Sequence, residues 1–244
     1  MTTLSDTPSW SDQPAGGIGA LPDLADPTTP TTPMGPRAAR WPWWAVVAGV
    51  TGLAANLTSM GATTADRDPD PLEVVENLPR LQYHVSFVLG LACAASLVVA
   101  IAALRPWIEQ RGGGRLSAAV VPPALSITAT LAVIAACMAG SLALYLPGGV
   151  DDGTMWIEGL AAAYYYLDFG ALIGWWGAML AAICILPMTM GERRVLPRWL
   201  GVVTIVLVAL PALAAAATGL PGLPGLTMPV WLIAFGVVLT RRAG

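Results

Sequence analysis

The chain has 244 residues, of which 56% are hydrophobic and only 11% charged, and its formal net charge is −3. Soluble domains carry about 25% charged residues, so this chain has too few charges to cover a surface that faces water. A nucleic-acid-binding protein needs a strongly basic patch, which this charge balance does not provide. The composition therefore excludes a soluble enzyme and a nucleic-acid partner. It predicts an integral membrane protein whose first partner is the lipid bilayer.

Residues 1–40 differ in composition from the rest of the chain. They are rich in proline, threonine, glycine and aspartate, and such a segment has too little apolar surface to offset the entropy of ordering. The first apolar run begins only at Trp43, too late for the apolar core of a cleaved secretory signal. We therefore expect a disordered cytoplasmic tail over 1–40 and a transmembrane domain over 41–244.

Six apolar runs follow this tail. A helix needs about 20 apolar residues to cross the hydrocarbon core of a bilayer, and the first and last runs are somewhat shorter. Pro211, inside the fifth run, predicts a kink because it removes one backbone hydrogen bond. The pattern predicts an all-α, polytopic bundle of six transmembrane helices. The expected spans are about 43–60, 82–104, 118–146, 163–188, 199–219 and 226–240.

The arginines provide an independent check on this count. With six spans, only Arg67 and Arg80 fall on the face that also carries the acidic loops, and the other ten fall on the opposite face. Cytoplasmic loops carry the excess of basic residues, so the pattern predicts a multi-pass plasma-membrane protein with both termini in the cytoplasm. The ten are Arg37, Arg40, Arg105, Arg111, Arg115, Arg193, Arg194, Arg198, Arg241 and Arg242.

The loop over 61–80 is then extracytoplasmic, and we expect part of it to be ordered. Leu72, Val75 and Leu78 recur at three-residue spacing with glutamates on the other side, which indicates a short amphipathic helix over 71–78.

Two ionisable residues lie inside expected spans, and such residues are functional candidates because charge is costly in a membrane. His84 is 20 residues, or about 30 Å of helix, from Leu104 at the cytoplasmic end of its span. Asp168 is 18 residues, or about 27 Å, from Leu186 at the cytoplasmic end of its own span. Both therefore lie near the outer edge of the hydrocarbon. They form a candidate polar site for binding or proton handling. The alternative, which we favour, is an ordinary interfacial hydrogen-bonded pair.

No motif for a catalytic, cofactor-binding or metal site is present, and we expect no cofactor. The three cysteines lie inside separate apolar runs without CxxC spacing, and a single histidine excludes a bis-histidine haem. Asn56, Thr58 and Ser59 in the first span, and Ser126 and Thr130 in the third, are polar residues of the kind that bridge helices.

The run Leu196-Pro-Arg-Trp-Leu-Gly201, followed by an apolar span, a Gly/Pro-rich turn and a short last span ending in Arg241-Arg242, resembles a known pattern. It is similar to uncharacterised six-span integral membrane proteins of high-GC actinobacteria, of the domain-of-unknown-function type. The similarity is concentrated in the C-terminal fifth. It implies a membrane bundle, and it brings neither an activity nor functional residues.

Together these patterns favour a non-catalytic accessory, structural or sensing component of the plasma membrane. We expect it to associate with another membrane protein or to form a homo-oligomer. One alternative is a small transporter or channel that works as an oligomer. The other is a membrane enzyme with an outer-face site at His84 and Asp168.

Overall fold

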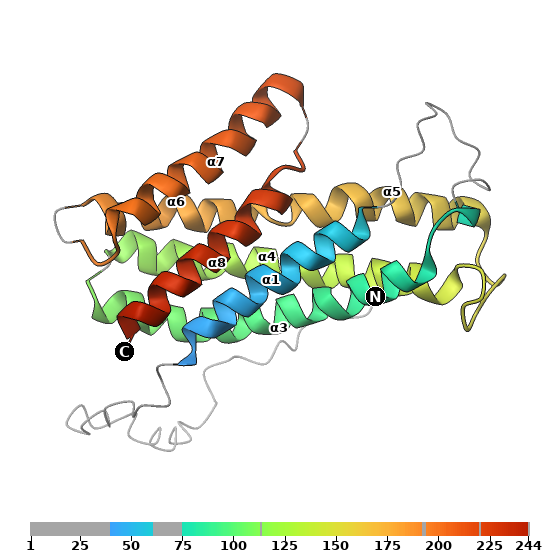
Figure 1. Cartoon of the computed structure of the whole chain (residues 1–244), viewed down its shortest axis with the longest axis horizontal. Helices are drawn as coiled ribbons and strands as arrows, with labels where there is room; N and C mark the ends of the chain where they lie inside the picture. The colour runs from blue at the N-terminus through green and yellow to red at the C-terminus, as the bar shows by residue number, and fades with distance from the viewer. Residues whose placement is uncertain (1–39, 61–74, 113, 192–193, 220, 244) are drawn as a thin grey trace, which may run out of the picture. The chain divides into compact units, whose positions relative to one another are not determined.

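The computed structural model describes residues 40–60, 75–112, 114–191, 194–219 and 221–243, and these residues are all-α (Figure 1). The expected disordered tail lies outside the described residues except for Arg40. Most of the expected amphipathic helix over 71–78 also lies outside them, although Val75 and Glu76 are helical and Val75 is buried. The helices are α1 (Pro42–Ser59), α3 (Arg80–Gln110), α4 (Arg115–Tyr145), α5 (Ile157–Ile173), α6 (Trp176–Met190), α7 (Arg198–Thr218) and α8 (Pro224–Ala243).

Five stretches of the described chain are long and apolar enough to cross a membrane, so the protein is a multi-pass membrane protein: α3, α4, α5 with α6, α7 and α8. The expected first span, α1, is not among them. Its 18 residues form a helix, but polar residues near its end dilute its hydropathy.

Helix bounds differ from the expected spans in two ways. The helix expected over 82–104 extends to Gln110, because a helix that leaves the hydrocarbon keeps its own backbone hydrogen bonds and can continue into water. The span expected over 163–188 is two helices, α5 and α6, separated at Gly174 and Trp175. The fifth expected span is α7, which continues through Pro211 as a single helix.

Small residues let neighbouring helices of the bundle approach closely. Gly90 of α3 faces Ala136 of α4, and the Ser117 hydroxyl of α4 donates to the Cys184 carbonyl of α6 at 2.7 Å. The first helix closes the bundle, since it lies between α3 and α8 (Figure 1). There Gly49 of α1 lies against the backbone of Pro229 and Ile233 in α8.

The buried side chains form two clusters. The larger one joins α1, α3, α4, α6, α7 and α8 and includes Leu97, Leu125 and Trp231. The smaller one, around Tyr83, Leu142 and Leu160, joins the start of α3 and the end of α4 to α5. The cavity described below lies between these two clusters.

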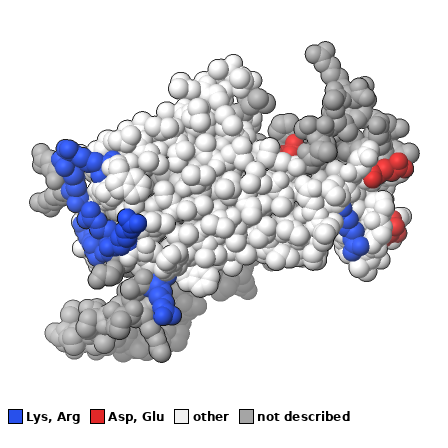
Figure 2. All heavy atoms as spheres, viewed as in Figure 1, with Lys and Arg blue, Asp and Glu red and all other residues white. Residues whose placement is uncertain are grey.

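Charge is separated between the two ends of the bundle (Figure 2). Arg111 donates to the Arg242 carbonyl at 3.0 Å, which ties the end of α3 to the end of α8. The opposite end carries Asp151, Asp152 and Glu158 together with Arg80. The described arginines on the side where α3 ends are Arg40, Arg105, Arg111, Arg115, Arg194, Arg198, Arg241 and Arg242.

Candidate functional site

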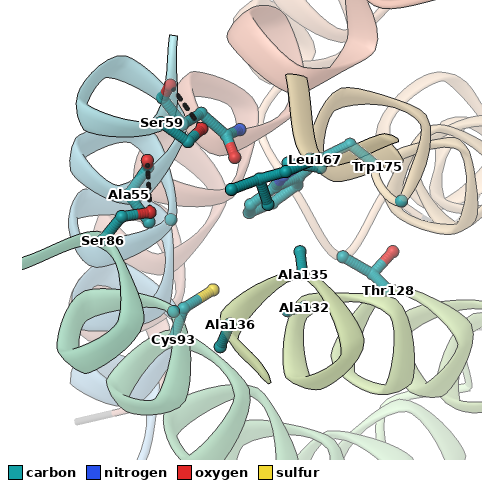
Figure 3. A pocket seen from close by; sticks show the side chains of 15 residues that line it. Ala55, Ser59, Ser86, Cys93, Thr128, Ala132, Ala135, Ala136, Leu167 and Trp175 are labelled. Carbon is teal, nitrogen blue, oxygen red and sulfur yellow. Dashed lines mark hydrogen bonds between the residues drawn. The ribbon is translucent and has the colours of Figure 1, made fainter. Parts of the chain in front are cut away.

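A cavity of about 30 Å³ lies inside the bundle, between α1, α3, α4 and the junction of α5 with α6 (Figure 3). A buried water needs about 10–15 Å³ of such space, so the cavity has room for one or two waters or an equally small solute. Its wall is built of small residues with a few neutral polar ones. The polar lining residues are Asn56, Ser59, Ser86, Cys93 and Thr128.

Three of these side chains already donate their protons to backbone carbonyls. The Asn56 amide donates to the Gly225 carbonyl of α8 at 2.6 Å, and the Ser86 hydroxyl donates to the Ala55 carbonyl of α1 at 3.2 Å. The Ser59 hydroxyl donates to the Asn56 carbonyl at 2.9 Å. A hydroxyl that donates its proton keeps two lone pairs, and the Asn56 carbonyl oxygen is also an acceptor. This part of the wall therefore favours a hydrogen-bond donor.

Thr128 differs from the other lining hydroxyls. Its side chain is 1% exposed, and among the described residues its hydroxyl has no hydrogen-bond partner. A buried polar group without a partner costs about 1–3 kcal/mol. The hydroxyl oxygen lies on the α6 side of α4, where a Cβ added at Gly177 would be only 2.7 Å from it.

One wall of the cavity is the α5–α6 junction, which contributes Leu167, Ala171, Gly174 and Trp175. Trp175 is buried at this junction, and its indole ring lies against the backbone of Gly52 in α1, where any Cβ would clash with it. A change in the angle between α5 and α6 would therefore change the cavity directly.

Two buried tyrosines lie next to the cavity, toward the start of α3 and of α5. Tyr83 is one helical turn from Ser86 on α3, and Tyr164 is one turn from Leu167 on α5. Tyr164 is also one helical turn from Asp168 on α5, and the Tyr83 hydroxyl has no hydrogen-bond partner among the described residues.

The two ionisable residues expected in the spans have different surroundings. Asp168 is half-buried on α5 beside the two tyrosines. His84 is exposed on α3, and its ring contacts Phe87 at 6.4 Å between centroids. Within the described ranges, no hydrogen bond or ion pair joins His84 to Asp168, so the paired site stays a prediction.

The cavity itself was not expected from the sequence. The helix-bridging role of Asn56 is confirmed by its bond to α8. Ser86, Gly90 and Cys93 place small or weakly polar groups on one face of α3 at helical spacing, and this is the signal that could have found the cavity. No sequence pattern singles out Thr128, because whether its hydroxyl has a hydrogen-bond partner depends on how α6 packs against α4.

Within the part of the chain that the structure describes, no group of three or more His, Cys, Asp and Glu side chains could hold a metal ion. In comparisons with known proteins, no family model, no curated protein and no solved structure matches the chain. The resemblance of the C-terminal fifth therefore stays a prediction, and the site is interpreted from its own chemistry.

Proposed function

We propose that the protein is a non-catalytic sensing component of the plasma membrane, in which occupancy of the central cavity is coupled to the α5–α6 angle. The proposal rests on one observation. The cavity is lined by uncharged side chains whose oxygen atoms can still accept hydrogen bonds, and it lies beside an interrupted helix. Such a wall offers hydrogen-bond acceptors to a small donor, and none of its side chains is an acidic or basic residue.

The proposal includes six spans, with α1 as the first. At 1.5 Å per residue its 18 residues measure about 27 Å, close to the thickness of the hydrocarbon core. Trp41 at its start contacts Trp107 near the end of α3, and tryptophans are typical of the membrane–water boundary. The polar Asn56 and Ser59 that lower its hydropathy are buried in the bundle, away from lipid.

We further propose that the arginine-rich end faces the cytoplasm, as the positive-inside rule requires. In a chain with its three cysteines replaced by alanine, single cysteines at Ala20, Gly112 and Asp152 test this. A membrane-impermeant thiol reagent added to intact cells should label Asp152→Cys and leave Ala20→Cys and Gly112→Cys unlabelled. Labelling of Ala20→Cys with Gly112→Cys protected would mean that α1 does not cross. Labelling of Gly112→Cys would reverse the orientation.

Cys93 gives a direct test of the cavity, because this native thiol is 1% exposed and lines the wall. In a Cys137→Ala, Cys184→Ala background, 2-aminoethyl methanethiosulfonate, a hydrogen-bond donor larger than one or two waters, reports whether the bundle opens enough at the α5–α6 junction to admit it to Cys93. We expect Cys93 to react from the outer side alone. Ser86→Val, which fills the cavity, should slow the reaction about tenfold. This corresponds to a rise of roughly 1.4 kcal/mol in the free-energy barrier to the reaction.

Ser141→Val is the matched control, since Ser141 is an exposed serine on α4 that does not line the cavity. It should leave the rate unchanged. A Cys93 thiol that fails to react from either side would mean that the bundle does not open at the cavity, and this would overturn the proposed coupling to the α5–α6 angle.

A transporter or channel is the second candidate, and one observation favours it. Transport sites are often formed where a transmembrane helix is interrupted near polar groups, and the α5–α6 interruption lies beside Thr128. Equal reaction of Cys93 from both sides of the membrane would support transport over sensing.

A further inference from the structure

A second hollow lies at the arginine-rich end, where α3 turns into α4. Its volume is about 520 Å³, which is far larger than the central cavity and is sufficient for a phosphate with its glycerol. Arg105 of α3 and Arg115 of α4 flank it, and Ile108, Ala118 and Ala119 form an apolar part of the wall. The hollow therefore offers positive charge beside an apolar surface.

The arginines of this end are not equivalent. Arg111 is already engaged, since its guanidinium lies 5.5 Å from the centre of the Trp107 ring and donates to the Arg242 carbonyl. Arg105 forms one exposed ion pair with Glu109 at 3.2 Å. Arg115 has no hydrogen-bond or ion-pair partner among the described residues. The two arginines and Glu109 leave a net charge of +1 in the hollow.

The start of α4 adds to this positive potential. A helix N-terminus carries a partial positive charge that an acidic residue or a capping side chain ordinarily offsets. Here the first helical residue is Arg115, the N-cap is Gly114, and the first turn has no acidic residue. An anion in the hollow would balance both the helix end and the arginines.

The position of the hollow indicates the source of that anion. Trp107 precedes Ile108 of the hollow in the sequence and contacts Trp41. The exposed Trp43 and Trp44 follow Trp41 in the chain, and exposed tryptophans are typical of the membrane boundary. At that depth the available group that combines one negative charge with an apolar tail is a phospholipid. We propose that this hollow binds the phosphodiester headgroup of an anionic phospholipid, with its glycerol and upper acyl chain against Ala118 and Ala119.

The test uses the full chain in detergent micelles with phosphatidylglycerol or phosphatidylcholine, and it counts retained lipids by native mass spectrometry. We expect phosphatidylglycerol to be retained, and Arg105→Gln with Arg115→Gln to weaken its binding about tenfold or more. The control is Arg194→Gln with Arg198→Gln, which removes the same charge from the same end but outside the hollow. This control should bind phosphatidylglycerol as the unaltered chain does.

Three results would overturn the proposal. Equal losses in the two double variants would show attraction to the whole basic end. No loss in either would show that the hollow is not the site. Displacement of the lipid by inorganic phosphate alone would show a site for a free anion. Because the readout is lipid retention and not Cys93 access, failure here is distinguishable from failure of the sensing proposal.

Discussion

Gly177→Ala is expected to lower the free energy of unfolding by about 2 kcal/mol, a typical cost of overpacking a tight interior. Gly177 of α6 lies against α4, and an added Cβ would sit 2.7 Å from the Thr128 hydroxyl oxygen and 3.1 Å from its backbone nitrogen, and would also clash with the Ala124 carbonyl. Backbone atoms cannot rotate away as a side chain can, so the two helices would have to separate. Unfolding in mixed micelles titrated with sodium dodecyl sulfate measures the change.

Gly170→Ala is the matched control, because Gly170 lies in α5 and an added Cβ there meets nothing within 4 Å. Both substitutions gain the higher helix propensity of alanine, about 1 kcal/mol in a helix interior. The control is therefore expected to be neutral or slightly stabilising. Equal effects at the two positions would contradict the close packing of α6 on α4 and, with it, the shape of the cavity wall at Thr128.

Trp231→Leu is expected to have the largest effect outside the cavity, about 3 kcal/mol, within the range for truncating a large buried side chain. Trp231 of α8 is fully buried, stacks on Phe235 at 5.1 Å, and donates to the Thr204 hydroxyl of α7 at 2.9 Å. α7 packs on α6 near its first residues and leans away from its neighbours further along (Figure 1). Its buried residues are Leu200, Gly201, Thr204 and Pro211.

The loss should be local to α7. Hydrogen exchange followed by mass spectrometry should show faster exchange in peptides from Arg198–Thr218 and little change in α3 and α4. Trp43→Leu serves as the control, since Trp43 is 55% exposed and should change neither stability nor exchange. Faster exchange throughout the bundle would mean that α7 is an integral part of the core and not a loosely held helix.

Patterns along the sequence were sufficient for the membrane class, the all-α fold and the separation of charge between the two ends. Hydropathy and arginine spacing are local properties, and a bilayer converts them directly into helices and loop positions. The same patterns were less informative for α1, whose polar Asn56 and Ser59 lower its hydropathy although both are buried within the bundle. Hydropathy counts a polar residue the same way whether it faces lipid or another helix.

The candidate site depended on packing. His84 and Asp168 were visible in the sequence as charges inside spans, yet the structure surrounds each with different neighbours, because one residue step along a helix turns a side chain by about 100°. The cavity combines Asn56, Ser86 and Thr128 from three helices with the interruption at Gly174 and Trp175. None of these residues is unusual alone. The way in which the helices cross decides whether a buried hydroxyl has a hydrogen-bond partner and whether small residues leave space between them. Only the tertiary structure determines these helix crossings.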